Sequence, residues 1–284
     1  MFNIEKFIQI RKSKNLSQTQ LCKGICTQAT LSKFENEGQP PSFKIMEKLC
    51  IRLGILTGDI MLRSDETPAS IKLQKAAIAC IQANFTRAYD LISSIKEEDL
   101  LRVDDQALFH LVVGIYALFY NRDQVKALFN FNTILTNPLI EEDNIYYALA
   151  TTACGLVYEE RHDYEKAEEN YSQIQKLLVN IKVTNKMSLF QVLWMLYQTG
   201  EYYGKRNNIK ESNYLLRYAY QIASQYNGTF FMSRILYRLG MNMVGHGKNH
   251  QAIQYLRDAH AFARFSHNQY ILTKAHQELN KLER

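Results

Sequence analysis

The chain has 284 residues, of which 46% are hydrophobic and 22% are charged. This composition is close to that of globular proteins and excludes an intrinsically disordered chain. Only four prolines and twelve glycines are present, fewer turn residues than an all-β chain of this length requires. We therefore expect an all-α protein, built as two domains, as a long repeat array, or as both.

The N-terminal segment and the cysteines bear on where the protein works. The first fifteen residues include Glu5 and lack the apolar run of a signal peptide. No later window reaches ~18 apolar residues without a charge. The five cysteines are odd in number and contain no CxxC pair, which gives no indication of a disulfide framework or a zinc site. We expect a cytoplasmic protein with reduced thiols, no membrane segment, no metal and no cofactor.

Positive charge is concentrated in the first quarter of the chain. Residues 1–64 contain ten Lys or Arg and five acidic residues, which gives a net charge of +5. The remaining residues contain 24 basic and 23 acidic side chains, which gives +1. Such an imbalance is expected where a small domain contacts nucleic-acid phosphates, although a soluble domain without DNA can also carry this charge.

The first two predicted helices are short and lie close together in the sequence. Apolar residues in helical spacing begin at Ile4 and predict a first helix of about ten residues. A second helix is expected to begin at Ser17, because Gln20 stands three residues later and can complete a capping box. We expect this second helix to bury Leu21 and Ile25.

The third predicted helix, residues 28–35, has the composition of a DNA-recognition helix. Leu31 and Phe34 are placed inward, whereas short polar residues and one lysine are placed outward. Such an outward face can reach base edges in the major groove. After a break at residues 38–42, an apolar stripe predicts a fourth helix, and residues 55–61 close a compact five-helix unit.

This region resembles the helix-turn-helix of the phage-repressor-like superfamily over the string LSQTQLCKGICTQATLSKFENEGQPPSFKIMEKLCIRLGI. More narrowly, its register is similar to the PlcR/Rgg type of peptide-responsive quorum-sensing transcriptional regulators, with residues 4–62 matching closely. The resemblance implies a structural ion pair between Arg11 and Glu35, which ties the first helix to the recognition helix. It also implies DNA contacts, to a phosphate from Gln18 and at the recognition positions Thr27, Gln28, Thr30 and Lys33. The alternative for Gln28 and Lys33 is an ordinary solvated helix face.

A second pattern begins near Ala69 and repeats through the rest of the chain. In three windows a glycine is followed twelve positions later by a small residue, and two looser copies precede them. The five small residues are 39, 40, 45 and 40 positions apart, and they are Ala88, Ala127, Ala167, Ser212 and Ala252. This period predicts tetratricopeptide-like helical hairpins, somewhat longer than the ~34-residue norm, that stack into an α-solenoid.

The repeat pattern sets the expected domain organisation and the packing within each hairpin. Glycine on the first helix and a small residue on the second should allow close approach, while Tyr or Leu fills the space between turns. A final helix, at about residues 267–282, should cap the stack. We expect a helix-turn-helix domain at residues 1–64 and a ligand-sensing and dimerisation domain at residues 65–284. An unrelated helical bundle is the alternative.

A stacked array of this kind curves, and its first helices line a concave wall on which an extended peptide can lie. Aromatic, amide and arginine side chains on this wall could bind side chains, backbone and a C-terminal carboxylate of a peptide. The expected positions are Thr152, Glu159, Trp194, Tyr197, Gln198, Glu201, Arg234, Tyr237, Arg238 and Asn242. The chain contains 18 tyrosines, so helix packing is the alternative for each tyrosine.

The resemblance also exposes one departure in this groove. In the resembled family, asparagines on inner helices hold the peptide backbone, whereas the corresponding positions here are Thr152 and Gln198. The departure leaves the expected fold unchanged. It leaves the identity and the pose of the peptide open.

No catalytic motif is present, and we do not expect an enzyme. His246 and His250 have metal-ligand spacing, but Gly245 and Gly247 flank the first and suggest a turn. We expect a sequence-specific transcriptional regulator that binds a double-stranded DNA operator as a homodimer and is controlled by a short signalling peptide. The alternatives are a regulator gated by a protein partner or by no ligand, and a repeat-based protein-interaction module.

Overall fold

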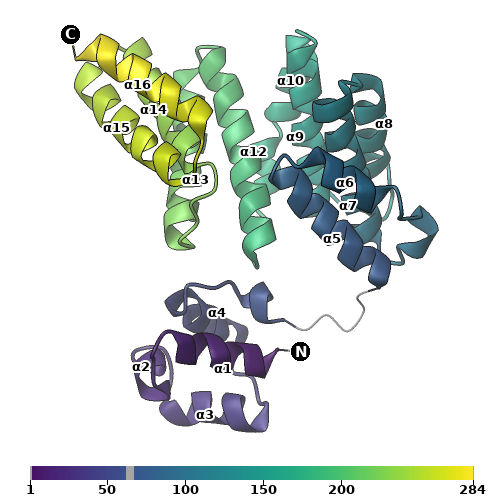
Figure 1. Cartoon of the computed structure of the whole chain (residues 1–284), viewed down its shortest axis with the longest axis vertical. Coiled ribbons are helices and arrows are strands. Elements are labelled where there is room, and N and C mark those ends of the chain that lie inside the picture. Colours follow the sequence, from purple (N-terminus) through teal and green to yellow (C-terminus); the bar gives the residue numbers. More distant parts are fainter. Residues whose placement is uncertain (1, 62–66, 284) are drawn as a thin grey trace.

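A computed structural model describes residues 2–61 and 67–283, which form a small helical unit and an array of helical hairpins (Figure 1). The expected all-α class is confirmed, since the described backbone contains helices, loops and one isolated β-bridge between Phe2 and Met61. The boundary predicted between residues 64 and 65 lies outside the described residues. None of the described helices is long and apolar enough to span a membrane.

The N-terminal unit has the five predicted helices, the last of which is a 3-10 helix. They are α1 (Ile4–Ser13), α2 (Gln18–Cys22), α3 (Gln28–Glu37), α4 (Phe43–Arg52) and η1 (Thr57–Ile60). The predicted capping box is confirmed: the Gln20 amide donates to Ser17 Oγ at 3.1 Å, and the Ser17 amide donates to Gln20 Oε1 at 2.8 Å. Because α2 ends at Cys22, Ile25 lies in the following turn and is only half-buried.

A compact core holds these helices together. Its buried side chains include Phe7 from α1, Leu31 and Phe34 from α3, and Met46 and Leu49 from α4. The rings of Phe7 and Phe34 meet edge to face, with centroids 5.2 Å apart, a geometry that adds to the apolar burial. The recognition helix is therefore fixed to α1 and α4 through its inward face, and its other face is left exposed.

Residues 67–283, as far as the structure describes them, form five helical hairpins and a closing helix, α16 (Gln269–Leu282). The hairpins are α5 (Pro68–Ile81) with α6 (Phe85–Ile92), α7 (Val103–Tyr116) with α8 (Gln124–Leu135), α9 (Ile145–Glu160) with α10 (Tyr164–Tyr171), α12 (Lys186–Lys205) with α13 (Ile209–Gln225), and α14 (Met232–Gly245) with α15 (Asn249–Phe265). All five predicted small residues lie in second helices and are fully buried. The predicted repeat array is thus confirmed.

The array departs from strict periodicity in two places. A short helix, α11 (Ile174–Leu178), and the loop after it separate the third hairpin from the fourth. This insertion accounts for the longest spacing between the repeat centres. In the second hairpin, a π-helical turn, η3 (Ala117–Asn121), continues α7, and a 3-10 helix, η2 (Glu97–Asp99), precedes it.

The predicted close contact within the hairpins is also confirmed. A Cβ atom added to Gly155 would lie 3.1 Å from the ring of Tyr171. A Cβ added to Gly200 would lie 2.8 Å from Leu216, and the equivalent contact at Gly240 is 2.8 Å from Leu256. In each of these three hairpins, the large side chain of the second helix occupies the space that a side chain on the first helix would need.

We expect Gly200→Ala to destabilise the protein by about 1–3 kcal/mol, because the new methyl group must displace Leu216 in a close-packed core. Gly245→Ala is the matched control, since a Cβ there meets nothing within 4 Å. Its higher helix propensity should leave stability equal or up to about 1 kcal/mol greater. Guanidinium unfolding followed by circular dichroism measures both. Equal midpoints for the two variants would contradict the packing argument.

Candidate DNA-binding surface and peptide groove

The recognition helix α3 lies on the side of the N-terminal unit that faces away from the repeat array (Figure 1). Its start is fixed by Thr27, whose side chain accepts a hydrogen bond from the Thr30 amide at 3.2 Å. The two threonine hydroxyls also lie 2.8 Å apart. Both predicted DNA contacts at these positions are therefore also engaged in capping the helix. Lys33 is exposed on the outer face of α3.

A continuous network of hydrogen bonds connects the outer surface of α2 and α3 to a buried ion pair. Arg11 donates two hydrogen bonds of 2.7 Å to the buried carboxylate of Glu35, as the structural ion pair requires. Gln18 Nε2 donates to the same carboxylate at 2.9 Å. Gln28 Nε2 then donates to Gln18 Oε1 at 2.7 Å. The two glutamines predicted to contact DNA are thus held by the ion pair, which presets their positions at the surface.

The concave-face candidates come from α9, α12 and α14, the first helices of three successive hairpins. A ladder of alternating charge joins these helices. Lys205 Nζ lies 3.0 Å from a carboxylate oxygen of Glu159 and 3.9 Å from one of Glu201. Arg238 donates two hydrogen bonds of 2.7 Å to Glu201. Two positive and two negative side chains thus neutralise one another across three helices.

Arg234 differs from Arg238 in having no acidic partner among the described residues. Its guanidinium lies 6.0 Å from the ring centroid of Tyr197, within the range of a cation–π contact. The side chain is exposed. Of the two predicted arginines, Arg234 is therefore the one whose charge is available to a carboxylate ligand.

Aromatic side chains surround this arginine. The ring of Tyr197 stacks on Phe231, with centroids 5.7 Å apart and planes inclined by 12°. Burial raises the pKa of Tyr197, and the charge of Glu201 raises it further, while Arg234 lowers it. Burial likewise raises the pKa of Tyr237. Both phenols thus remain protonated at neutral pH, while Trp194 and Gln198 are half-buried beside them on α12.

The structure buries three of the ten predicted groove residues: Tyr197, which is 8% exposed and packs in the main hydrophobic cluster, Thr152 and Asn242. Thr152 is fully buried, and its hydroxyl donates to the Ala148 carbonyl oxygen at 2.8 Å. Asn242 is 1% exposed, and its amide nitrogen donates to Ser212 Oγ and to Asn213 Oδ1. Thr152 and Asn242 face a neighbouring helix because they lie on the packed side of the first helices. They are therefore removed from the candidate groove.

A cavity of about 550 Å³, which the sequence did not predict, lies between first helices of the repeats and the η1 region of the N-terminal unit, where Gly58, Asp59 and Met61 line it. Its wall combines Ile78 from α5, Leu108 from α7, Tyr146 from α9 and Phe190 from α12. The volume lies within the range of small-ligand pockets. A signal was present in α5, where apolar residues occur on more than one face and leave Ile78 45% exposed.

Residues 7–60 match the helix-turn-helix family. The N-terminal unit is a helix-turn-helix domain. No curated protein matches the sequence of this chain.

Solved structures match the chain over almost its entire length. One is PlcR of Bacillus thuringiensis in complex with the peptide PapR7 and DNA, with 17% identity, a TM-score of 0.60 and 99% of each chain covered. Another is the apo form of the competence regulator ComR from Streptococcus vestibularis, with 13% identity, a TM-score of 0.59, and 97% of this chain and 96% of that chain covered. A third is ComR from S. thermophilus in complex with DNA and its signalling peptide ComS, with 13% identity, a TM-score of 0.54 and 98% of both chains covered. These likenesses confirm the fold that the resemblance to the PlcR type implied.

We expect Arg11→Met to destabilise the helix-turn-helix domain by about 3–5 kcal/mol, because Glu35 would remain buried without its cation. Hydrogen exchange at the amides of α1 and α3 measures this loss. The double variant Arg11→Met with Glu35→Leu removes both charges and should recover most of the protection. Unchanged exchange in the single variant, together with weaker DNA binding, would show that Arg11 contacts a phosphate instead.

Proposed function

We propose that this protein is a sequence-specific DNA-binding transcriptional regulator whose activity is controlled by a short signalling peptide. The main support for this proposal is that one chain combines two features. A helix-turn-helix domain presents its recognition helix to solvent, and a ligand-sized cavity lies between first helices of the repeat array and the η1 region of the N-terminal unit. PlcR and ComR, which share this fold, have been solved with DNA and a signalling peptide bound.

The DNA-binding part of the proposal rests on the outer face of α3. Gln28 and Lys33 are exposed there, and the residues beneath them are fixed by the Arg11–Glu35 ion pair. A single helix-turn-helix contacts few bases and phosphates, so useful specificity needs two copies. We therefore propose a homodimer on a two-part DNA site, working in the cytoplasm, with a domain boundary between residues 64 and 65.

The peptide-binding part combines the two regions of the concave face. The cavity lined by α5, α7, α9 and α12 can accept apolar side chains, because its wall includes Leu108 and Phe190. The amide of Gln198 makes no hydrogen bond to another described residue and can bond to a peptide backbone. Arg234 can bind a carboxylate, since the other arginine at this site is already paired with Glu201. An extended peptide uses all three kinds of contact.

For DNA binding, we expect Gln28→Ala and Lys33→Ala to weaken affinity for a duplex that the protein selects from a random-sequence library. Loss of a base contact should cost about 1–3 kcal/mol and leave the melting temperature nearly unchanged, because both side chains point outward. Lys96→Ala, a change of an exposed lysine in the repeat array, is the control. If both α3 variants bind the selected duplex like the parent, the recognition-helix assignment is wrong.

For peptide binding, we expect short peptides encoded beside the gene to change the fluorescence of Trp194, the only tryptophan in the chain. Arg234→Ala and Gln198→Ala should weaken this response, whereas Arg217→Ala, on an outer helix, should not. The bound peptide should alter DNA affinity by about 1–3 kcal/mol, and DNA should alter peptide affinity by the same factor. A regulator gated by a protein partner, or by no ligand, would bind the duplex without any response to peptide.

A further inference from the structure

The helix-turn-helix domain docks on the repeat array through an unusually close backbone contact. The Gly58 amide, in η1, donates to the carbonyl oxygen of Thr184, just before α12. A Cβ added to Gly58 would lie 2.7 Å from both this oxygen and Asn185 Cβ. Beside this contact, Leu56 is 5% exposed and packs into the main hydrophobic core of the repeats. The two domains therefore share a defined interface in this structure.

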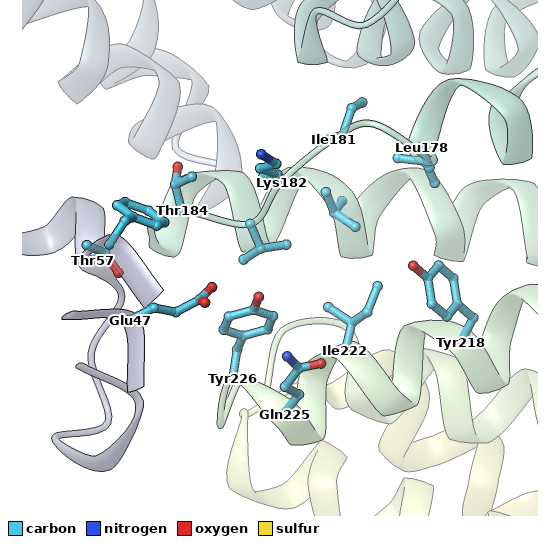
Figure 2. Close-up of a pocket in the computed structure, with 13 residues that line it drawn as sticks. Glu47, Thr57, Leu178, Ile181, Lys182, Thr184, Tyr218, Ile222, Gln225 and Tyr226 are labelled. Carbon is cyan, nitrogen blue, oxygen red and sulfur yellow. The ribbon is translucent and has the colours of Figure 1, made fainter. Parts of the chain in front are cut away.

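A cavity of about 250 Å³ lies at this interface (Figure 2). One wall belongs to the helix-turn-helix domain and includes Phe43, Glu47 and Thr57. The other wall is formed by the loop after α11, by the first turns of α12 and by the C-terminal half of α13. Neither domain closes the cavity alone.

The repeat side of the cavity is mainly apolar, and its aliphatic surface comes from Ile181, Val192 and Ile222. Tyr218 of α13 and Tyr226, the residue directly after this helix, add ring faces and hydroxyls (Figure 2). The apolar part of a ligand can therefore be buried against three elements of the array. Removal of apolar surface from water stabilises such a complex.

Glu47 places a negative charge at the edge of this apolar space. Figure 2 shows its carboxylate directed from α4 toward Tyr226. The carboxylate makes no hydrogen bond or ion pair with any residue in the described ranges. Lys182 also lines the cavity, but its side chain is exposed and its ammonium points away from Glu47 in Figure 2. Burial raises the pKa of Tyr226, and the charge of Glu47 raises it further, so that phenol stays neutral.

A carboxylate without a partner, set beside aromatic rings and aliphatic side chains, matches one ligand chemistry. We propose that the cavity binds a small amphipathic amine, whose ammonium group pairs with Glu47 and contacts the ring of Tyr226. Its apolar part lies against Ile181, Val192 and Ile222. An ammonium gains from a carboxylate and from an aromatic face, whereas an anion is repelled by Glu47.

Because the two walls belong to different domains, a bound amine holds the helix-turn-helix domain in its docked position. Ligand that binds only this arrangement stabilises it by mass action. No residue lines both this cavity and the larger cavity of the candidate peptide site, and amine binding can be measured without DNA or peptide. Its test is thus independent of the proposed function.

Calorimetric titration of the full-length protein near neutral pH tests the proposal, with phenethylamine as the probe. We expect saturable binding of one phenethylamine per chain. Binding of 2-phenylethanol, which has no charge, should be about tenfold weaker or more. Glu47→Gln should weaken phenethylamine binding to the level of the alcohol. Glu5→Gln, a change of an exposed glutamate on α1, should leave amine affinity unchanged.

Two further variants test whether phenethylamine binds in this cavity. Ile222→Phe fills the space and should abolish binding while circular dichroism remains that of the parent. Asp104→Asn, beside the larger concave cavity, should have no effect. The proposal is overturned if phenethylamine does not saturate the protein at millimolar concentration, or if Glu47→Gln binds it like the parent. Tighter binding of 3-phenylpropanoate than of phenethylamine would also overturn it, because Lys182 would then set the ligand class.

Discussion

In three of the hairpins, the two helices approach closely because the first helix carries no side chain at the crossing point. Gly155, Gly200 and Gly240 provide these points, and the facing Tyr or Leu fills the space. A larger residue would push the second helix outward and leave voids, which destabilise a core in proportion to their volume. Since each hairpin buries its apolar face only against its neighbours, every stacked contact depends on this spacing.

On the concave face, some charged side chains are paired with one another, whereas Arg234 has no acidic partner among the described residues. Stacking brings α9, α12 and α14 side by side, and the ladder from Glu159 to Arg238 neutralises the charges that would otherwise repel or remain unpaired. Arg234 stands one turn from Arg238 on α14 but lies outside the ladder. A site that must attract a ligand carboxylate needs such a cation, whereas paired charges mainly fix helix positions.

Much of the fold could be predicted because periodic glycines and caps leave local signals. The Ser17 capping box and the buried Ala167 are examples. Site residues were harder to predict, because a shift of one position along a helix moves a side chain from the concave surface into the core. Thr152 was predicted on the groove but lies in the core, because its neighbours along α9 are buried on almost every side. The cavity near Phe190 was missed because it forms only when four separate helices converge.

The longest repeat interval, between Ala167 and Ser212, contains the residue that contacts the helix-turn-helix domain. The insertion containing α11 ends in the loop that carries Thr184, and this residue both precedes α12 and accepts the Gly58 hydrogen bond. The position of the first turn of α12 is therefore tied to that of η1 by a backbone hydrogen bond. The irregular interval thus supplies the residue through which the array binds the helix-turn-helix domain. An array with uniform repeats would lack the loop that carries this residue.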